Sequence, residues 1–251
     1  MNGADMTLPV YAINLDRSRG RWADLAASAE RAGLPLIRVP GVDGRAVAEA
    51  DRIEVSEPDF RRMTGRTMRP GEYGCYRSHL AALDAIAASG AGAAIIAEDD
   101  IAFGDRFAER AEALLRACPD ADVIKLFNHR TKGFRLKARS ALGDGIGRCL
   151  HGPQGSAACY LVTAAGAHRL SSALRPMQLP YDVALERGWA TGAEVYTVER
   201  DIAGLGALEV ETEIGSREDY RRTRLPGYRR LPTHLFRAMD YARRVIYCLG
   251  P

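Results

Sequence analysis

Short apolar runs alternate with longer amphipathic segments along the chain. A run of about four to eight apolar residues rich in β-branched side chains predicts a strand buried on both faces. Such runs occupy 10–15, 36–39, 93–97, 122–127, 157–162 and 194–198. Apolar residues spaced by three or four positions predict helices at about 22–32, 71–89, 106–117 and 164–174. Strands that alternate with helices are typical of an α/β protein with a mostly parallel sheet.

The first strand, the first helix and the second strand form a βαβ unit, in which Gly33 ends the helix. Because parallel strands end at one edge of a sheet, the polar residues behind these two strands are expected to share a rim. They are Asn14, Arg17, Arg21, Asp43 and Arg45. Such an amide and acid can bind a base or sugar, and arginines can hold a pyrophosphate. A solvated helix start is the alternative for the arginines.

Three consecutive acids, Glu98, Asp99 and Asp100, follow the apolar run 93–97. Like charges at the end of a buried strand repel one another, so folding alone does not require them. A divalent cation would account for them, because Mg²⁺ and Mn²⁺ take carboxylate oxygens and in turn bind phosphates. The alternative is a solvated acidic turn that caps the next helix. No Gly-x-Gly-x-x-Gly or Walker motif is present, which argues against dinucleotide and P-loop sites.

Two neighbouring segments carry further candidate chemistry. Residues 60–70 contain four arginines and are expected to be irregular, either a lid over an anionic substrate or a solvated loop. In the helix 71–89, His79 borders the apolar stripe, where a histidine is commonly a core residue with satisfied nitrogens. Its neighbour Ser78 is less informative.

The later part of the chain gives fewer signals. Residues 128–145 are polar and contain glycines, which predicts a loop or a hairpin. Thr163 is placed to cap the helix 164–174. Pro180 precedes a short helix that carries Asp182 in its first turn.

The C-terminal segment is basic and amphipathic. Nine arginines between 216 and 244 face three acids, whereas the whole chain has a net charge of only +3. Apolar residues recur every three or four positions from 233 to 249, at Leu235, Met239, Ala242, Ile246 and Leu249. Arg237, Asp240 and Arg244 lie on the opposite face. Such a helix can lie on an anionic membrane or dock on the rest of the protein. We expect a catalytic part at 1–215 and a tail at 216–251.

Composition narrows the class of protein. The 251 residues suffice for a large core. No run approaches the roughly 18 apolar residues of a membrane span, and the first nine residues lack the basic start of a signal peptide. The five scattered cysteines form no Cys-x-x-Cys motif, so we expect reduced thiols in a cytoplasmic protein. A nucleic-acid partner is not expected, because basic charge is confined to the tail. The sequence sets no oligomeric state.

Several motifs in order resemble glycosyltransferase family 25, which includes bacterial lipopolysaccharide-biosynthesis enzymes. They are Ile-Asn-Leu-Asp-Arg-Ser-Arg-Gly-Arg at 13–21, Val-Asp-Gly-Arg at 42–45, Pro-Gly-Glu-Tyr-Gly-Cys-Tyr-Arg-Ser-His-Leu at 70–80 and Ile-Ile-Ala-Glu-Asp-Asp at 95–100. Weaker similarity follows at 155–167 and 180–182. Where the family usually has a valine and an acid, this chain has Tyr181 and Gly20. The tyrosine can alter the acceptor pocket.

The resemblance implies a GT-A-like, Rossmann-type α/β fold. It also implies a nucleotide-sugar donor, such as a UDP-galactose or UDP-glucose, with Mn²⁺ or Mg²⁺. Glu98 and Asp100 then flank Asp99 as the metal-binding acidic motif, with Asp100 the first choice for metal contact. The donor-site residues that it implies are Asn14, Leu15, Arg17, Arg21, Asp43, Arg45, Ser78, His79 and Asp99.

The resemblance also implies an acceptor and a stereochemical outcome. The acceptor would be a saccharide or lipid-linked saccharide of a bacterial surface glycan, and transfer would invert the anomeric carbon. Inversion by single displacement needs a carboxylate that takes the proton of the acceptor hydroxyl, and Asp182 is the candidate. Its alternative role is a helix cap. The tail could hold the enzyme at the inner face of the cytoplasmic membrane.

Two other functions use the same residues. A metal-dependent phosphodiesterase or nuclease could use the three acids with His79 on a phosphodiester. A non-catalytic member of the fold could bind or assemble without turnover, although the retention of all three acids argues against it.

Overall fold

The computed structural model describes residues 8–206 and 222–250. Within these residues, eight strands form one sheet in the order β2-β1-β3-β8-β5-β9-β7-β6. Their bounds are β1 (Val10–Asn14), β2 (Leu36–Pro40), β3 (Ala93–Glu98), β5 (Val123–Lys125), β6 (Phe134–Arg139), β7 (Gly145–Cys149), β8 (Cys159–Thr163) and β9 (Val195–Val198). A separate antiparallel pair joins β4 (Ile101–Phe103) to β10 (Ala203–Leu205).

The sheet is mixed but runs mainly in one direction. β1 pairs in parallel with β2 and β3, and β5 pairs in parallel with β9. β8 is antiparallel to both β3 and β5, and β7 is antiparallel to both β9 and β6. All strands except β8 and β7 therefore point the same way, and the expected α/β class with a mostly parallel sheet is confirmed. The sequence predicted a loop or a hairpin at 128–145. The structure has a hairpin, in which β6 pairs with β7.

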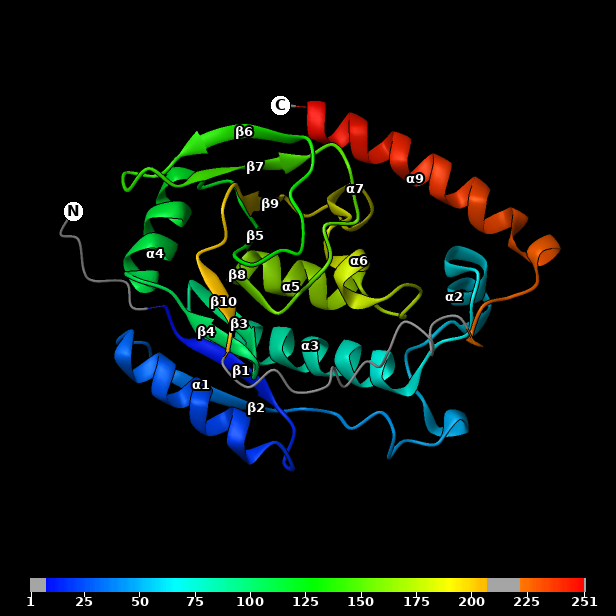
Figure 1. The fold of residues 1–251 in the computed structure, drawn as a ribbon, viewed down its shortest axis with the longest axis horizontal. Coiled ribbons are helices and arrows are strands. Elements are labelled where there is room, and N and C mark those ends of the chain that lie inside the picture. The colour runs from blue at the N-terminus through cyan, green and yellow to red at the C-terminus, as the bar shows by residue number, and fades with distance from the viewer. Residues whose placement is uncertain (1–7, 207–221, 251) are drawn as a thin grey trace.

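Helices cover both faces of the sheet (Figure 1). Their bounds are α1 (Arg19–Arg31), α2 (Glu57–Thr64), α3 (Pro70–Ser89), α4 (Phe107–Ala117), α5 (Ala164–Ala173), α6 (Tyr181–Leu185), α7 (Gly188–Thr191) and α9 (Leu231–Leu249), with single 3₁₀ turns at η1 (Glu49–Asp51) and η2 (Gly227–Arg230). None of these helices combines the length and the apolar character needed to cross a membrane.

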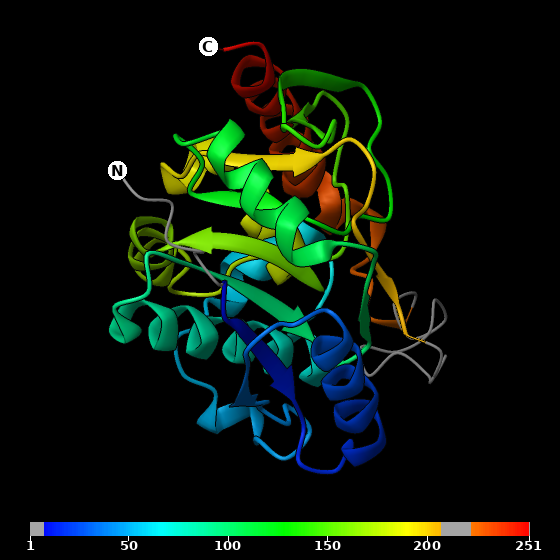
Figure 2. The same ribbon diagram turned by 90° about the vertical axis from the view of Figure 1, so that its left-hand side faces the viewer.

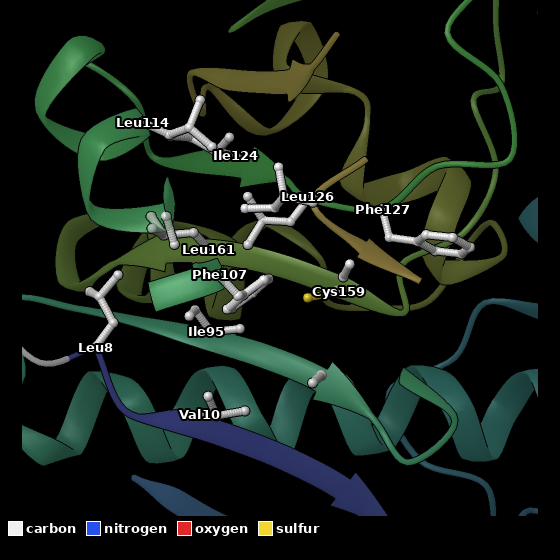
Figure 3. Close-up of a cluster of buried hydrophobic side chains, with 14 of the residues drawn as sticks. Leu8, Val10, Ile95, Phe107, Leu114, Ile124, Leu126, Phe127, Cys159 and Leu161 are labelled. Atoms are coloured by element: carbon white, nitrogen blue, oxygen red, sulfur yellow. The ribbon is translucent and has the colours of Figure 1, made fainter. Parts of the chain in front are cut away.

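Two hydrophobic cores lie on opposite faces of the sheet because side chains alternate along each strand. In β3, Ile95 points to the core beneath α1 and α4, and Ile96 points to the core beneath α3, α5 and α6. Figure 2 shows α1 and α4 on the near side of the sheet. Figure 3 shows the first core, in which Phe107 and Leu114 of α4 pack toward the strands. The central strands are buried on both faces, as their continuous apolar runs predict.

The prediction of an irregular segment at 60–70 is wrong for its first part. Residues 57–64 form α2, whose Phe60 is fully buried, and Gly65 ends the helix in a left-handed conformation. Arg66 pairs with the buried carboxylate of Glu72, and that carboxylate also accepts from the backbone N of Arg69 (3.0 Å). This contact fixes the start of α3, so the segment is neither a solvated loop nor an unattached lid.

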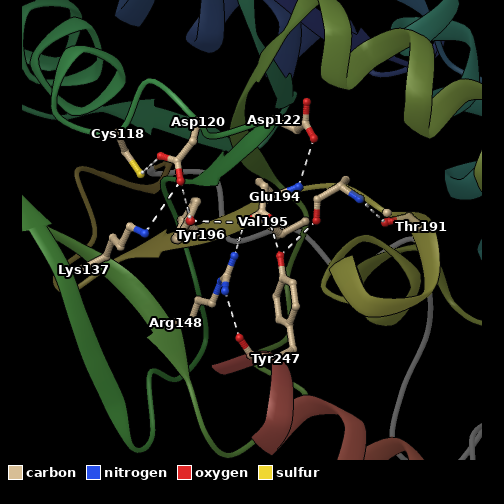
Figure 4. A network of polar contacts seen from close by, with 12 residues as sticks. Cys118, Asp120, Asp122, Lys137, Arg148, Thr191, Glu194, Val195, Tyr196 and Tyr247 are labelled. Carbon is tan, nitrogen blue, oxygen red and sulfur yellow. Dashed lines mark hydrogen bonds and ion pairs between the residues drawn. The ribbon is translucent and has the colours of Figure 1, made fainter. Parts of the chain in front are cut away.

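Helix α9 packs against α2 and α7 along the outer edge of the molecule (Figure 1). Its Tyr247 reaches β9, where the hydroxyl accepts from Val195 N (2.8 Å) and donates to Ala193 O (2.9 Å). Arg148 of β7 donates to the backbone O of Tyr247 (2.8 Å), as Figure 4 shows. The tail helix is thus attached to the sheet. The expected boundary at 215/216 lies outside the described residues.

Candidate active site

The ends of β2, β1 and β3 meet at one edge of the sheet because these three neighbours are parallel. The loop 41–45 that follows β2 turns from this edge onto the first turns of α3. A Cβ on Gly44 would overlap the backbone O of Pro70, and a Cβ on Gly74 would overlap the backbone O of Val42. Only glycines allow the loop and the helix to approach so closely. Backbone N of Val42 also donates to Ser78 Oγ (2.8 Å), which ties the loop to α3.

A pocket of about 650 Å³ opens at this edge. Its lining comes from the ends of β1 and β3, from the loop 41–45 and from one face of α3: Ile13, Leu15, Arg17, Arg21, Gly41, Val42, Asp43, Gly44, Arg45, Gly71, Cys75, Ser78, His79, Glu98 and Asp99. The pocket therefore brings together residues that the sequence separates by more than eighty positions.

Asp99 forms the centre of the pocket floor. Its Oδ2 accepts from Asn14 Nδ2 (2.7 Å), and its Oδ1 pairs with Arg21 (3.0 Å). Asn14 is buried, and its Oδ1 accepts from Arg38 Nε (3.0 Å). The amide thus orients the carboxylate from beneath the pocket, although Asn14 itself does not line it.

The rim of the pocket carries a second pairing of acid and arginine. Arg17 pairs with Asp43, whose Oδ1 also accepts from the backbone N of Arg45 (3.0 Å). The Asp43 side chain is one-third exposed, so the pair faces solvent at the mouth of the pocket. Arg17, Arg21 and Arg45 together make this mouth cationic, which suits a ligand with phosphate groups.

A buried hydrogen-bond chain holds Glu98. Its Oε1 lies 3.1 Å from Nε2 of His79, and Nδ1 of His79 lies 3.2 Å from the hydroxyl of Tyr160. The hydroxyls of Tyr160 and Tyr181 are 2.8 Å apart, and the Tyr181 ring stacks on the imidazole at 4.1 Å between centroids. An ionised carboxylate only accepts, so Nε2 donates to Glu98. The contacts at both ring nitrogens hold the imidazole oriented toward Glu98.

Asp100 lies at the edge of an adjoining pocket of about 620 Å³, which shares Asp99 and Arg21 with the first. Burial and the charges of Glu98 and Asp99 raise the pKa of Asp100 to about 6. Its Oδ1 is buried, and among the described residues it has no hydrogen-bond partner. A buried carboxylate oxygen without a donor, beside two further acids, is the arrangement that a cation stabilises.

The side chains present fit a divalent cation at this edge. Asp99 is engaged by an amide and an arginine, so Glu98 and Asp100 are the acids that would hold the ion. Cys75 and His79 accompany Glu98, with one potential ligand atom from each within 4.8 Å of one another. Burial, together with the charges of Glu98 and Asp182, raises the pKa of the Cys75 thiol well above its ordinary value. A protonated thiol is a poor ligand for hard ions, which leaves the carboxylates.

Asp182 is placed apart from the residues that line the first pocket. It lies in the first turn of α6, and its charge acts on the Cys75 thiol within that pocket. Burial raises the pKa of Asp182, and the charge of Glu186 raises it further. A carboxyl with a raised pKa is a stronger base when ionised, which suits a group that accepts a proton.

Most of the residues expected from the sequence share one pocket. Leu15, Ser78 and His79 line it with the two acids Glu98 and Asp99, whereas the sequence did not indicate a role for Cys75 or Tyr160. Cys75 lies four positions before His79, on the same helix face, which is a usable signal. Tyr160 gave none, because a tyrosine in an apolar strand has the pattern of a core residue.

The fold and the site define an α/β protein with a pocket, lined by arginines and acids, at the carboxyl ends of its parallel strands. The profile described as Glycosyltransferase family 25 (LPS biosynthesis protein) matches residues 7–185. The chain therefore belongs to glycosyltransferase family 25, and the expected Rossmann-like fold is confirmed. All the residues of the site described above fall within the matched range.

Two mammalian relatives are similar over a shorter stretch. The Probable inactive glycosyltransferase 25 family member 3 of Rattus norvegicus is 30% identical over 110 residues. The Inactive glycosyltransferase 25 family member 3 of Mus musculus is 29% identical over 110 residues. Each match covers 42% of this chain and 19% of the relative. The chain thus spans about a fifth of the length of the curated relatives it matches.

Proposed function

We propose that this chain is a metal-dependent glycosyltransferase. It would transfer a hexose, galactose or glucose, from a UDP-sugar to a saccharide acceptor of a bacterial surface glycan such as lipopolysaccharide. The observation that carries the proposal is the pocket that brings Arg17, Arg21 and Arg45 together with Glu98 and Asp99, beside the buried carboxyl of Asp100. Membership of the family supports transferase chemistry, and the pocket supports a phosphorylated donor.

The arginines of the pocket mouth have a direct role in this proposal. Arg17 pairs with Asp43, and Arg21 pairs with Asp99. A donor diphosphate would either replace these carboxylates as the partner of the arginines or bind the arginines in addition to them. Paired guanidinium groups are held in position before the ligand arrives, which lowers the entropy lost on binding. Asp43 and backbone groups of its loop would bind the base or the ribose.

The acids at the sheet edge divide into different roles. Glu98 and Asp100 would hold Mn²⁺ or Mg²⁺, which supplies Lewis-acid stabilisation of the leaving diphosphate. Asp99 instead maintains the floor through Asn14 and Arg21. Asp182 would accept the proton of the acceptor hydroxyl, because burial gives it the raised pKa of a base.

Calorimetry and turnover of the same samples test this proposal. UDP with Mn²⁺ should bind more tightly than ADP or GDP with Mn²⁺, and UDP release from UDP-hexose should require a saccharide acceptor. Asp100→Ala should abolish both the Mn²⁺ dependence and turnover. Asp105→Ala, which removes an exposed acid five positions later, is the matched control and should change neither.

Each competing function gives a different result. Full turnover by Asp100→Ala in the presence of chelator would exclude the metal role. Release of a nucleoside monophosphate from simple diesters, without any acceptor, would instead indicate a phosphodiesterase. Binding of UDP and Mn²⁺ with no turnover on any acceptor would favour a non-catalytic protein; the names of the two relatives call those proteins inactive.

A further inference from the structure

Helix α9 turns its polar face toward the body of the protein. Arg244 is buried and pairs with Glu186 (3.0 Å), and Asp240 pairs with Arg187 (2.8 Å). Thr233, near the start of the helix, is fully buried and donates to Arg62 O (2.8 Å). Together with Tyr247, these side chains satisfy the inner face of the helix with hydrogen bonds and ion pairs.

The apolar face of α9 consequently points to solvent. We call the outer stripe the five large apolar residues at helical spacing along this face: Leu231 (73% exposed), Leu235 (63%), Met239 (49%), Ile246 (72%) and Leu249 (57%). Of the twelve exposed large apolar side chains in the described residues, seven lie between 228 and 249. A concentration of this kind on one element marks an interaction surface, whereas single exposed residues do not.

Positive charge lies at one border of the outer stripe and near the start of α9. Arg243 is exposed and borders it, four positions after Met239 and three before Ile246. Near the first turns of α9, four guanidinium groups gather closely enough to affect one another: burial and the charges of the other three lower the pKa of Arg237. The others are Arg230, Arg224 and Arg66. Asp240 is the single acid in the described residues 222–250, and the body already pairs it.

The outer stripe and its arginines together indicate which partner this face of α9 would bind. In a symmetric dimer built on the outer stripe, the same patch would meet itself, and the arginines of the two copies would repel each other. An anionic surface meets the arginines with opposite charge and the stripe with an apolar layer. An amphipathic helix with basic borders lies in the interface of a lipid bilayer, with its apolar face among the upper acyl chains.

We propose that α9 is a docking surface for an anionic lipid bilayer, with the outer stripe inserted and the neighbouring arginines at the headgroups. The helix does not have to leave the body to bind, because its inner face keeps its partners. The proposal does not depend on the identity of the donor sugar or on turnover.

Co-sedimentation of the full chain with vesicles tests the proposal. The vesicles contain either phosphatidylcholine alone or phosphatidylcholine with an equal part of phosphatidylglycerol. The protein should partition onto the anionic vesicles at low salt, and binding should weaken as salt screens the arginines. L235E/I246E places two charges in the outer stripe and should lower partitioning at least about tenfold. R243A should lower it by a smaller factor, about fivefold.

The control is Ile53→Glu, which changes a side chain nearly as exposed (59%) as Leu235 (63%) but far from α9 in the sequence. It should bind vesicles like the unchanged protein. Because all the substituted side chains are exposed, melting curves should show each variant folded. The proposal fails if the unchanged protein ignores anionic vesicles at low salt, or if L235E/I246E binds them equally well. It also fails if the protein is a dimer that L235E/I246E dissociates while neither form binds vesicles.

Discussion

Replacing Asp100 by asparagine removes a carboxyl whose pKa is raised from 3.8 to about 6 by burial and by the charges of Glu98 and Asp99. The folded state prefers the protonated acid. Its contribution to stability is therefore present below about pH 4 and is lost as the pH rises through about 6. The full shift corresponds to at most about 3 kcal/mol at neutral pH. Roughly 1.4 kcal/mol of this develops between pH 5 and pH 7.5.

Urea denaturation in EDTA at these two pH values measures the effect. Asp100→Asn should unfold at higher urea than the unchanged protein at pH 7.5, and its advantage should shrink by roughly 1.4 kcal/mol at pH 5. Asp105→Asn serves as the control and should show no such change. Mn²⁺ at about a hundred times its dissociation constant should add about 2.7 kcal/mol to the unchanged protein and nothing to Asp100→Asn.

Two results would contradict a raised pKa at Asp100. If Asp100→Asn is less stable than the unchanged protein at pH 7.5 in EDTA, the carboxyl is not under electrostatic strain. If the difference in stability is the same at both pH values, no ionisation is involved. Either result would remove the main structural reason for placing a cation beside Asp100.

Three further substitutions test other parts of the structure. Gly74→Ala should cost about 1–3 kcal/mol in urea denaturation and weaken UDP binding in calorimetry, and unchanged values would show that the neighbouring loop can move. Lys125→Met should cost about 3–5 kcal/mol because it leaves Glu186 buried with one cation fewer; a neutral effect on melting would contradict this. Tyr160→Phe should cost about 1–3 kcal/mol and weaken Mn²⁺ binding by releasing His79. Loss of stability with unchanged Mn²⁺ affinity would make Tyr160 purely structural.

The sheet and its rim could be predicted from the sequence because they rest on local patterns. Continuous apolar runs located β1, β3 and β8 to within two residues, since a strand buried on both faces leaves that pattern. The rule that parallel strands end at one edge then brought Arg17 and Asp43 to the same pocket. No knowledge of distant contacts was needed for either inference.

Other features depend on contacts that no local pattern records. The start of the arginine-rich segment 60–70 belongs to α2, whose Phe60 is buried, and Arg66 pairs with the carboxylate of Glu72, a partner that follows it in the chain. The role of Tyr160 depends on facing His79 across two elements far apart in the sequence. Periodicity showed that α9 is amphipathic, but it could not show which face would meet the body.

The orientation of α9 follows from a charge buried in the sheet. Lys125 in β5 is fully buried, and Glu186 accepts from it at 3.2 Å. Burial alone would raise the pKa of Glu186, but Lys125 and Arg244, with backbone donors, lower it overall, so the carboxylate is ionised. Arg244 is supplied by the polar face of α9. Without Arg244, Glu186 would keep one buried cation fewer, and removing a partner of a buried charge costs several kcal/mol. The contact that anchors the helix therefore also leaves its apolar face outward. The surface that we assign to the bilayer results from the pairing of Arg244 with the buried carboxylate of Glu186.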